Sequence, residues 1–132
     1  MRTNFAAIEI EQVIFIHHRI AAIEGKIGGA KNLPLLHSTL ETCKARFGGE
    51  ELYFSLFDKA ATLFHSLVTN QVFLAENLKT AYAVTLRFLN SNGYVITASQ
   101  EEIIQFCKKV SQHKLKVTEI TEWLEKYCQA RT

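Results

Sequence analysis

Residues 51–68 constrain the fold most, because their apolar side chains fall on nearly every side of a helix rather than on one face. These side chains are Leu52, Phe54, Leu56, Phe57, Ala60, Ala61, Leu63, Phe64 and Leu67. A helix that is apolar all round is a buried helix, since water would otherwise contact one of its apolar faces. The sequence therefore predicts a central helix here, with the other elements packed around it.

Five further segments carry helical patterns, and no set of segments convincingly predicts a sheet. Their expected ranges are residues 9–24, 34–46, 77–91, 99–111 and 119–129. Glycine marks several expected ends: Gly25 follows the first helix, Gly48 and Gly49 are expected to break the second, and Gly93 follows the fourth. Residues 94–97 are expected to form a short extended segment. The pattern predicts an all-α, six-helix bundle.

The composition predicts one folded domain over residues 1–132. Hydrophobic residues make up 48% of the chain and Pro occurs once, so the chain can bury a core without disulfide or metal staples. The 15 basic and 13 acidic residues are interspersed and give a net charge of +2. This balance gives no basic patch that would follow a phosphate backbone, so we do not expect nucleic-acid binding.

The cysteines and the apolar runs indicate a cytoplasmic protein. Cys43, Cys107 and Cys128 are far apart and lack metal-ligand spacing, which favours free thiols in a reducing compartment over a zinc site or disulfides. The N-terminal residues lack the apolar run of a signal peptide. No window approaches the roughly 20 apolar residues that span a membrane. We therefore expect a cytoplasmic location, no metal site and no membrane partner.

Residues 71–81 read Gln-Val-Phe-Leu-Ala-Glu-Asn-Leu-Lys-Thr-Ala and lie between the third and fourth expected helices. This segment resembles the active-site loop of the Fic/Doc family, which reads roughly H-x-F-x-[DN]-[GA]-N-K-R-T-A. The matching letters are Phe73, Asn77, Thr80 and Ala81.

The resemblance extends over about residues 8–123 and is to Doc-like, death-on-curing proteins. It is carried by Ile16 and His17, residues 33–40, residues 59–61, residues 87–94 and residues 120–124. It implies a Fic/Doc-like bundle with a buried central helix and the motif loop before the fourth helix.

The residues that carry the reaction in the family are replaced here. The family's loop histidine is the general base that deprotonates a target hydroxyl, which then attacks a phosphate of a bound nucleotide. Gln71 occupies that position, and loss of a positioned base costs ~10²- to 10⁴-fold in rate. Ala75 occupies the acidic position that helps to hold the metal. Mg²⁺ is usually held by one or two carboxylates together with phosphate oxygens.

The phosphate-binding letters have changed as well. Glu76 replaces the small residue of the cradle and puts a negative charge there, although a carboxylate suits the first turn of its own helix. Leu78 replaces a lysine, and Lys79 replaces an arginine and loses its bidentate fork. The segment is a degenerate nucleotide-binding loop with no catalytic residue to assign. Its members are Gln71, Phe73, Ala75, Glu76, Asn77, Leu78 and Lys79.

Histidines outside the loop are weaker candidates. His17 and His18 are adjacent on the first helix and face apart, so we expect one partly packed and one exposed side chain rather than a joint metal site. His65 lies six residues before Gln71 and is a candidate for a compensating base. A histidine packed at the edge of the core is the ordinary interpretation. Residues 25–29 lack the spacing of a phosphate-binding loop and predict a turn.

Three functions stay open. The favoured hypothesis is a Fic/Doc-fold, death-on-curing toxin-like protein that has lost nucleotide-dependent transfer and acts by protein binding. The resemblance implies an antitoxin-like peptide or a regulatory target as its partner. A second hypothesis is an active phospho- or AMP-transferase with altered residues, and only this one requires ATP and Mg²⁺. A third is a structural helical interaction module.

Overall fold

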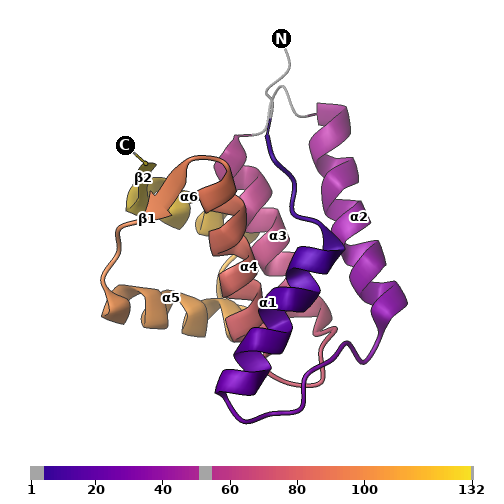
Figure 1. Cartoon of the computed structure of the whole chain (residues 1–132). Helices are drawn as coiled ribbons and strands as arrows, with labels where there is room; N and C mark the ends of the chain where they lie inside the picture. The colour runs from indigo at the N-terminus through magenta and orange to yellow at the C-terminus, as the bar shows by residue number, and fades with distance from the viewer. Residues whose placement is uncertain (1–4, 51–54, 132) are drawn as a thin grey trace.

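The computed structural model describes residues 5–50 and 55–131, which form a bundle of helices (Figure 1). The helices are α1 (Ile10–Ile23), α2 (Leu33–Glu50), α3 (Leu56–Asn70), α4 (Asn77–Ser91), α5 (Gln100–Ser111) and α6 (Val117–Tyr127). Two short strands, β1 (Tyr94–Ile96) and β2 (Cys128–Ala130), form an antiparallel pair. The predicted all-α, six-helix class is confirmed.

The helix α3 is central, as its apolar pattern predicts. It packs against α2, α4, α5 and α6, and Figure 1 shows it near the middle of the bundle. Its buried apolar side chains are Ala60, Ala61, Leu63, Phe64, Leu67 and Val68. The helix begins at Leu56, after the cap Ser55, whose Oγ accepts from the Asp58 N–H at 3.1 Å. The expected helical residues 51–54 lie outside the described residues.

The expected break of α2 at Gly48 and Gly49 is wrong, because the helix continues through both glycines to Glu50. Glycine inside a helix costs about 1 kcal/mol relative to Ala, which weakens a helix without ending it. Since α2 also packs against α3, tertiary contacts support the helix against a cost of that size.

The segment after α4 is extended, as predicted, but it has a partner that the sequence did not indicate. β1 pairs with β2 in a register that places Tyr94 opposite Ala130. The expected helix over residues 128–129 is therefore wrong, since these residues belong to β2. The Thr97 N–H and hydroxyl both donate to the Tyr127 carbonyl, at 2.7 and 2.9 Å. These bonds satisfy the last carbonyl of α6 and help to end the helix there.

The helices α1 and α4 pack against each other and position the motif loop. Both match their predicted ranges to within one residue at each end. The end of α1 meets the start of α4, because Glu24 Oε2 and Lys79 Nζ are 2.9 Å apart. The loop between α3 and α4 therefore lies where α1, α3 and α4 converge (Figure 1). Within the described residues, no helix is long and apolar enough to cross a membrane.

Replacing Ser99 with Ala should remove the cap of α5 and lower the free energy of unfolding by about 1 kcal/mol. Ser99 Oγ accepts from the Glu102 N–H at 3.1 Å, and Glu102 Oε1 accepts from the Ser99 N–H at 2.9 Å, which together form a capping box. Denaturant unfolding measures the change. Ser91→Ala, at an exposed position near the end of α4, is the control and should stay within about 0.5 kcal/mol of wild type. Equal losses in the two variants would contradict the role of the cap.

Candidate functional site

The degenerate loop forms the turn between α3 and α4, and its two ends have left-handed backbone. Gln71 ends α3 with a φ of 44°, and Glu76 precedes α4 with a φ of 58°. The middle of the loop pairs with residues 29–31 through two backbone hydrogen bonds, of 2.9 and 3.0 Å. All seven predicted loop residues are thus brought together in this turn and the first turn of α4.

Asn77 closes the loop onto itself through Phe73. The Phe73 N–H donates to Asn77 Oδ1 at 3.0 Å, and Asn77 Nδ2 donates to the Phe73 carbonyl at 3.0 Å. Phe73 is buried, and a buried backbone N–H or carbonyl without a partner is costly. The asparagine side chain therefore supplies both partners that the backbone of Phe73 needs.

His17 supports the loop from α1. Its ring stacks on the Phe73 ring, with centroids 4.0 Å apart and planes 15° apart. Its Nδ1 lies 3.0 Å from the hydroxyl oxygen of Thr80, a buried residue in the first turns of α4. Ala81 beside it is fully buried as well. The four residues that match the motif, together with His17, therefore hold the loop in place by packing or hydrogen bonds and form its frame.

His17 is more deeply buried than the sequence predicted. The expectation was one partly packed and one exposed histidine, but His17 is fully buried while His18 is exposed. Within the described residues, His17 Nε2 is buried without a hydrogen-bond partner. Burial lowers the pKa of His17 below its usual value, the charge of His18 lowers it further, and Glu76 opposes the shift. His17 is thus a buried imidazole that supports the loop through its contacts with Phe73 and Thr80.

Lys79, the one cation among the loop residues, is already engaged by two carboxylates. Its Nζ lies 2.9 Å from Glu24 Oε2 and 3.7 Å from Glu76 Oε1. The hydrogen bond to Glu24 is the main cause that raises the pKa of Lys79. Glu24 is the residue of this site that sequence reasoning missed, because no local pattern connects the end of the first helix with the fourth. Only the packing of α1 against α4 brings it there.

The remaining loop positions offer little chemistry. Gln71 is exposed at the end of α3, and Ala75 and Leu78 are half-buried. His65 is half-buried on α3, in agreement with the ordinary interpretation of a histidine at the edge of the core. In the part of the chain that the structure describes, no group of three or more His, Cys, Asp or Glu side chains is placed to hold a metal ion.

A family model described as the Fic/DOC family matches residues 7–89, well over half of the chain. The chain belongs to the Fic/DOC family. The match spans α1 to α4 and so includes the loop, whereas α5 and α6 lie beyond it. None of the curated proteins compared with the chain matches it. The residues of the loop therefore lie within the part of the chain that matches the family.

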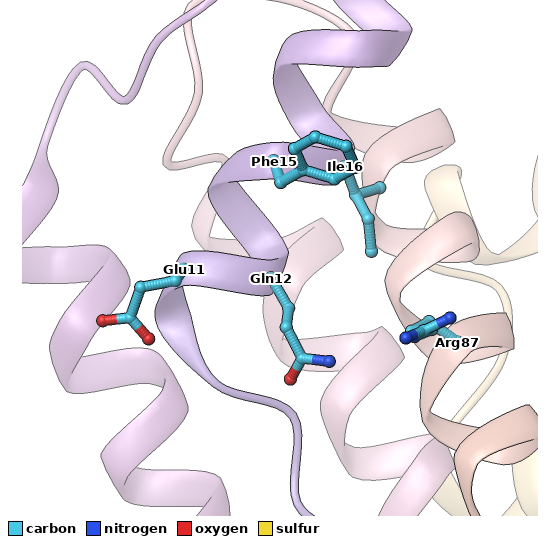
Figure 2. Close-up of a pocket in the computed structure, with 5 residues that line it drawn as sticks. All are labelled: Glu11, Gln12, Phe15, Ile16 and Arg87. Carbon is cyan, nitrogen blue, oxygen red and sulfur yellow. The ribbon is translucent and has the colours of Figure 1, made fainter.

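An apolar groove lies along α1 and α4, towards the other end of these helices from the loop. It is about 340 Å³ in volume and is lined by Glu11, Gln12, Phe15, Ile16 and Arg87. Figure 2 shows the first four residues on α1 and Arg87 on α4, with Gln12 and Ile16 directed toward the side of Arg87 and Glu11 directed away from it. Phe15 is 62% exposed, although large aromatic side chains are usually packed. The groove therefore combines an exposed aromatic side chain with one acidic and one basic lining residue.

Replacing Asn77 with Ala should lower the free energy of unfolding by about 1–3 kcal/mol, because it strands the buried N–H and carbonyl of Phe73. Asn77→Asp keeps an acceptor for the Phe73 N–H but turns a carboxylate oxygen toward the Phe73 carbonyl in place of the N–H donor, so it should be destabilised as well. Denaturant unfolding of both variants measures the losses. Equal stability of Asn77→Ala and wild type would contradict the framing role of Asn77.

The burial of His17 should make stability depend on pH. Its folded pKa lies below the usual value of 6.5, so the unfolded chain binds the proton more readily. This contribution is fully present above about pH 6.5 and is lost as the pH falls from there through the folded pKa. Unfolding measured across this range should show the loss in wild type and in His37→Gln, which changes an exposed histidine on α2, but a weaker one in His17→Gln. An unchanged pH dependence in His17→Gln would contradict the assignment.

Proposed function

We propose that this Fic/DOC-family protein has lost nucleotide-dependent transfer and acts by binding another protein, in a toxin–antitoxin-like or regulatory role. The observation that carries the proposal is the pairing of Lys79 with Glu24 and Glu76. These three groups have a net charge of −1 at the place where the family binds phosphate. The cation that would have to clamp a nucleotide is neutralised within the chain itself.

Electrostatic repulsion makes a nucleotide an unfavourable ligand for this loop. The side chain of Glu76 is only 18% exposed, so water screens its charge poorly. A phosphate about 4 Å from a carboxylate is repelled by roughly 4 kcal/mol at an effective dielectric near 20. This repulsion weakens binding on the order of 1,000-fold. Leu78 offers no compensating charge at the position where the family has a lysine.

The reaction also lacks a base. Gln71 stands at the histidine position, and its amide cannot take a proton from a hydroxyl near neutral pH. His17 lies close to the loop but is buried, stacked on Phe73 and within hydrogen-bonding distance of Thr80. A substrate hydroxyl would have to displace the frame of the loop to reach it. Loss of both base and phosphate clamp argues against transfer more strongly than either loss alone.

The groove between α1 and α4 supports a protein-binding role. Phe15 and Ile16 provide an apolar floor, and no ion pair of Arg87 is found within the described residues. An amphipathic helical peptide suits such a surface, because its apolar face packs on the floor while its polar face stays in water. An acidic residue beside that apolar face would pair with Arg87. We therefore propose an acidic, antitoxin-like amphipathic helix as the partner.

One observation favours residual transferase activity as a second candidate. The side chain of Glu76 makes no capping hydrogen bond at the start of α4. The free N–H groups of the first helical turn are therefore not occupied by this carboxylate, and such groups attract anions. An active enzyme would have to hold a phosphate there with these donors, Asn77 and Lys79. The two candidates differ in whether ATP binds at all.

Calorimetry with MgATP and label transfer from ATP to a lysate should show neither binding nor transfer for the wild-type protein. The triple variant Glu76→Gly, Leu78→Lys and Lys79→Arg should bind ATP, and adding Glu24→Gln should strengthen binding by freeing the new arginine. Gln71→His alone should change nothing, because a base is useless without bound nucleotide. Micromolar affinity or transferred label with the wild-type protein would overturn the loss of transfer.

A further inference from the structure

A second pocket lies between α4 and α5, next to the altered loop but on another side of α4 from the groove in Figure 2. It has a volume of about 340 Å³, within the range of small-molecule sites. Leu78 and Tyr82 form its α4 wall, and Ile103, Ile104 and Cys107 form its α5 wall. The family match ends at Leu89, so the α5 wall lies outside the matched region.

One of the replaced motif residues, Leu78, makes the α4 wall of the pocket apolar. Leu78 stands where the resemblance places a lysine, and it is half-buried against the α5 side chains. A lysine there would bring a charge into this wall, and burying an unpaired charge is strongly unfavourable. Ile104 is 48% exposed although it is a large aliphatic residue, so the wall also reaches the surface. An apolar ligand would remove both side chains from water.

The basic residues at the rim of the pocket favour an apolar ligand that also carries a negative charge. Among the described residues that line the pocket, only Lys79 and Lys108 are charged, and none carries a carboxylate. Lys79 is held by Glu24 and Glu76, whereas no ion pair of Lys108 is found within the described residues. Lys108 is exposed at the edge of α5 and is therefore available to an anion. A carboxylate attached to an apolar body complements both features of the pocket.

The other polar groups of the pocket are neutral near physiological pH. Burial raises the pKa of Cys107 to about 11 and is the main cause that raises the pKa of Tyr82 to about 12. Neither group therefore repels an anion, and the Cys107 thiol has little nucleophilic thiolate. Binding at this site should consequently be reversible, without a covalent step.

We propose that the pocket between α4 and α5 binds a small amphipathic carboxylate, whose apolar chain packs between Leu78 and Ile104 and whose carboxylate pairs with Lys108. The ligand is a medium-chain or similarly sized apolar acid, and octanoate represents its chemistry. This proposal does not depend on the protein-binding role, because that role uses the groove formed by α1 and α4.

Calorimetric titration of the full chain with octanoate, at concentrations below micelle formation, tests the proposal. Saturable binding is expected, with acetate too small to bind. Ile104→Gln should weaken binding about ten-fold, because it removes an aliphatic side chain from the apolar wall. Leu33→Gln is the matched control: Leu33 is 51% exposed, begins α2 and lies outside this pocket, so that variant should bind like wild type. Equal binding of octanoate by the Ile104→Gln and wild-type proteins would overturn the site.

The charge part of the proposal has its own test. Lys108→Gln should weaken octanoate binding about three- to five-fold, the size of an exposed ion pair, and should leave the binding of 1-octanol unchanged. If 1-octanol binds wild type as tightly as octanoate and Lys108→Gln has no effect, the carboxylate assignment is wrong. MgATP added to the octanoate complex should not displace it. Displacement by ATP would make the pocket part of a nucleotide site and overturn the proposal.

Discussion

The stacking of Phe73 on His17 is the contact on which the rest of the site depends. It joins the loop to α1 through two rings 4.0 Å apart, and the same histidine reaches Thr80 on α4. Asn77 completes the frame by bonding both backbone groups of Phe73. Since Phe73, His17 and Thr80 are all buried, loss of any one of them leaves a void or an unpaired polar group. The position of the loop is therefore set by packing and hydrogen bonds inside the protein.

Because packing positions the loop, residues at its catalytic and phosphate-binding positions can change while the fold of the loop stays the same. The residues shared with the family motif hold the loop in place. The replaced residues stand at the positions that the resemblance assigns to catalysis and phosphate binding. Glu76 illustrates the separation: its left-handed backbone, with a φ of 58°, suits the small residue that the motif has there and costs a glutamate about 1–2 kcal/mol. The chain nevertheless keeps that backbone, because residues on both sides of it are fixed by the frame. The side chain then adds a negative charge beside Lys79.

The sequence predicted the elements that depend on local signals and missed those that depend on contacts between distant residues. The all-round apolar pattern correctly indicated α3 as the central helix, and the range of α4 agrees with its prediction. The break expected at the two glycines in α2 was wrong, because the modest cost of glycine inside a helix does not outweigh tertiary packing. β2 was missed because only its pairing with β1 makes residues 128–130 extended. The pairing of Glu24 with Lys79 was missed for a similar reason, as the two residues are far apart in the sequence.

The frame of the family's loop persists here, while we propose that its phosphate site does not. The most direct measurement is the position of the backbone amide resonances of Asn77, Leu78 and Lys79 during titration with MgATP. These amides begin α4 and would contact a phosphate bound at the helix start. Loss of the phosphate site predicts that these resonances stay unshifted at millimolar ATP while the chain remains folded. Saturable shifts confined to these amides would show that phosphate still binds there, and would contradict the loss of the phosphate site.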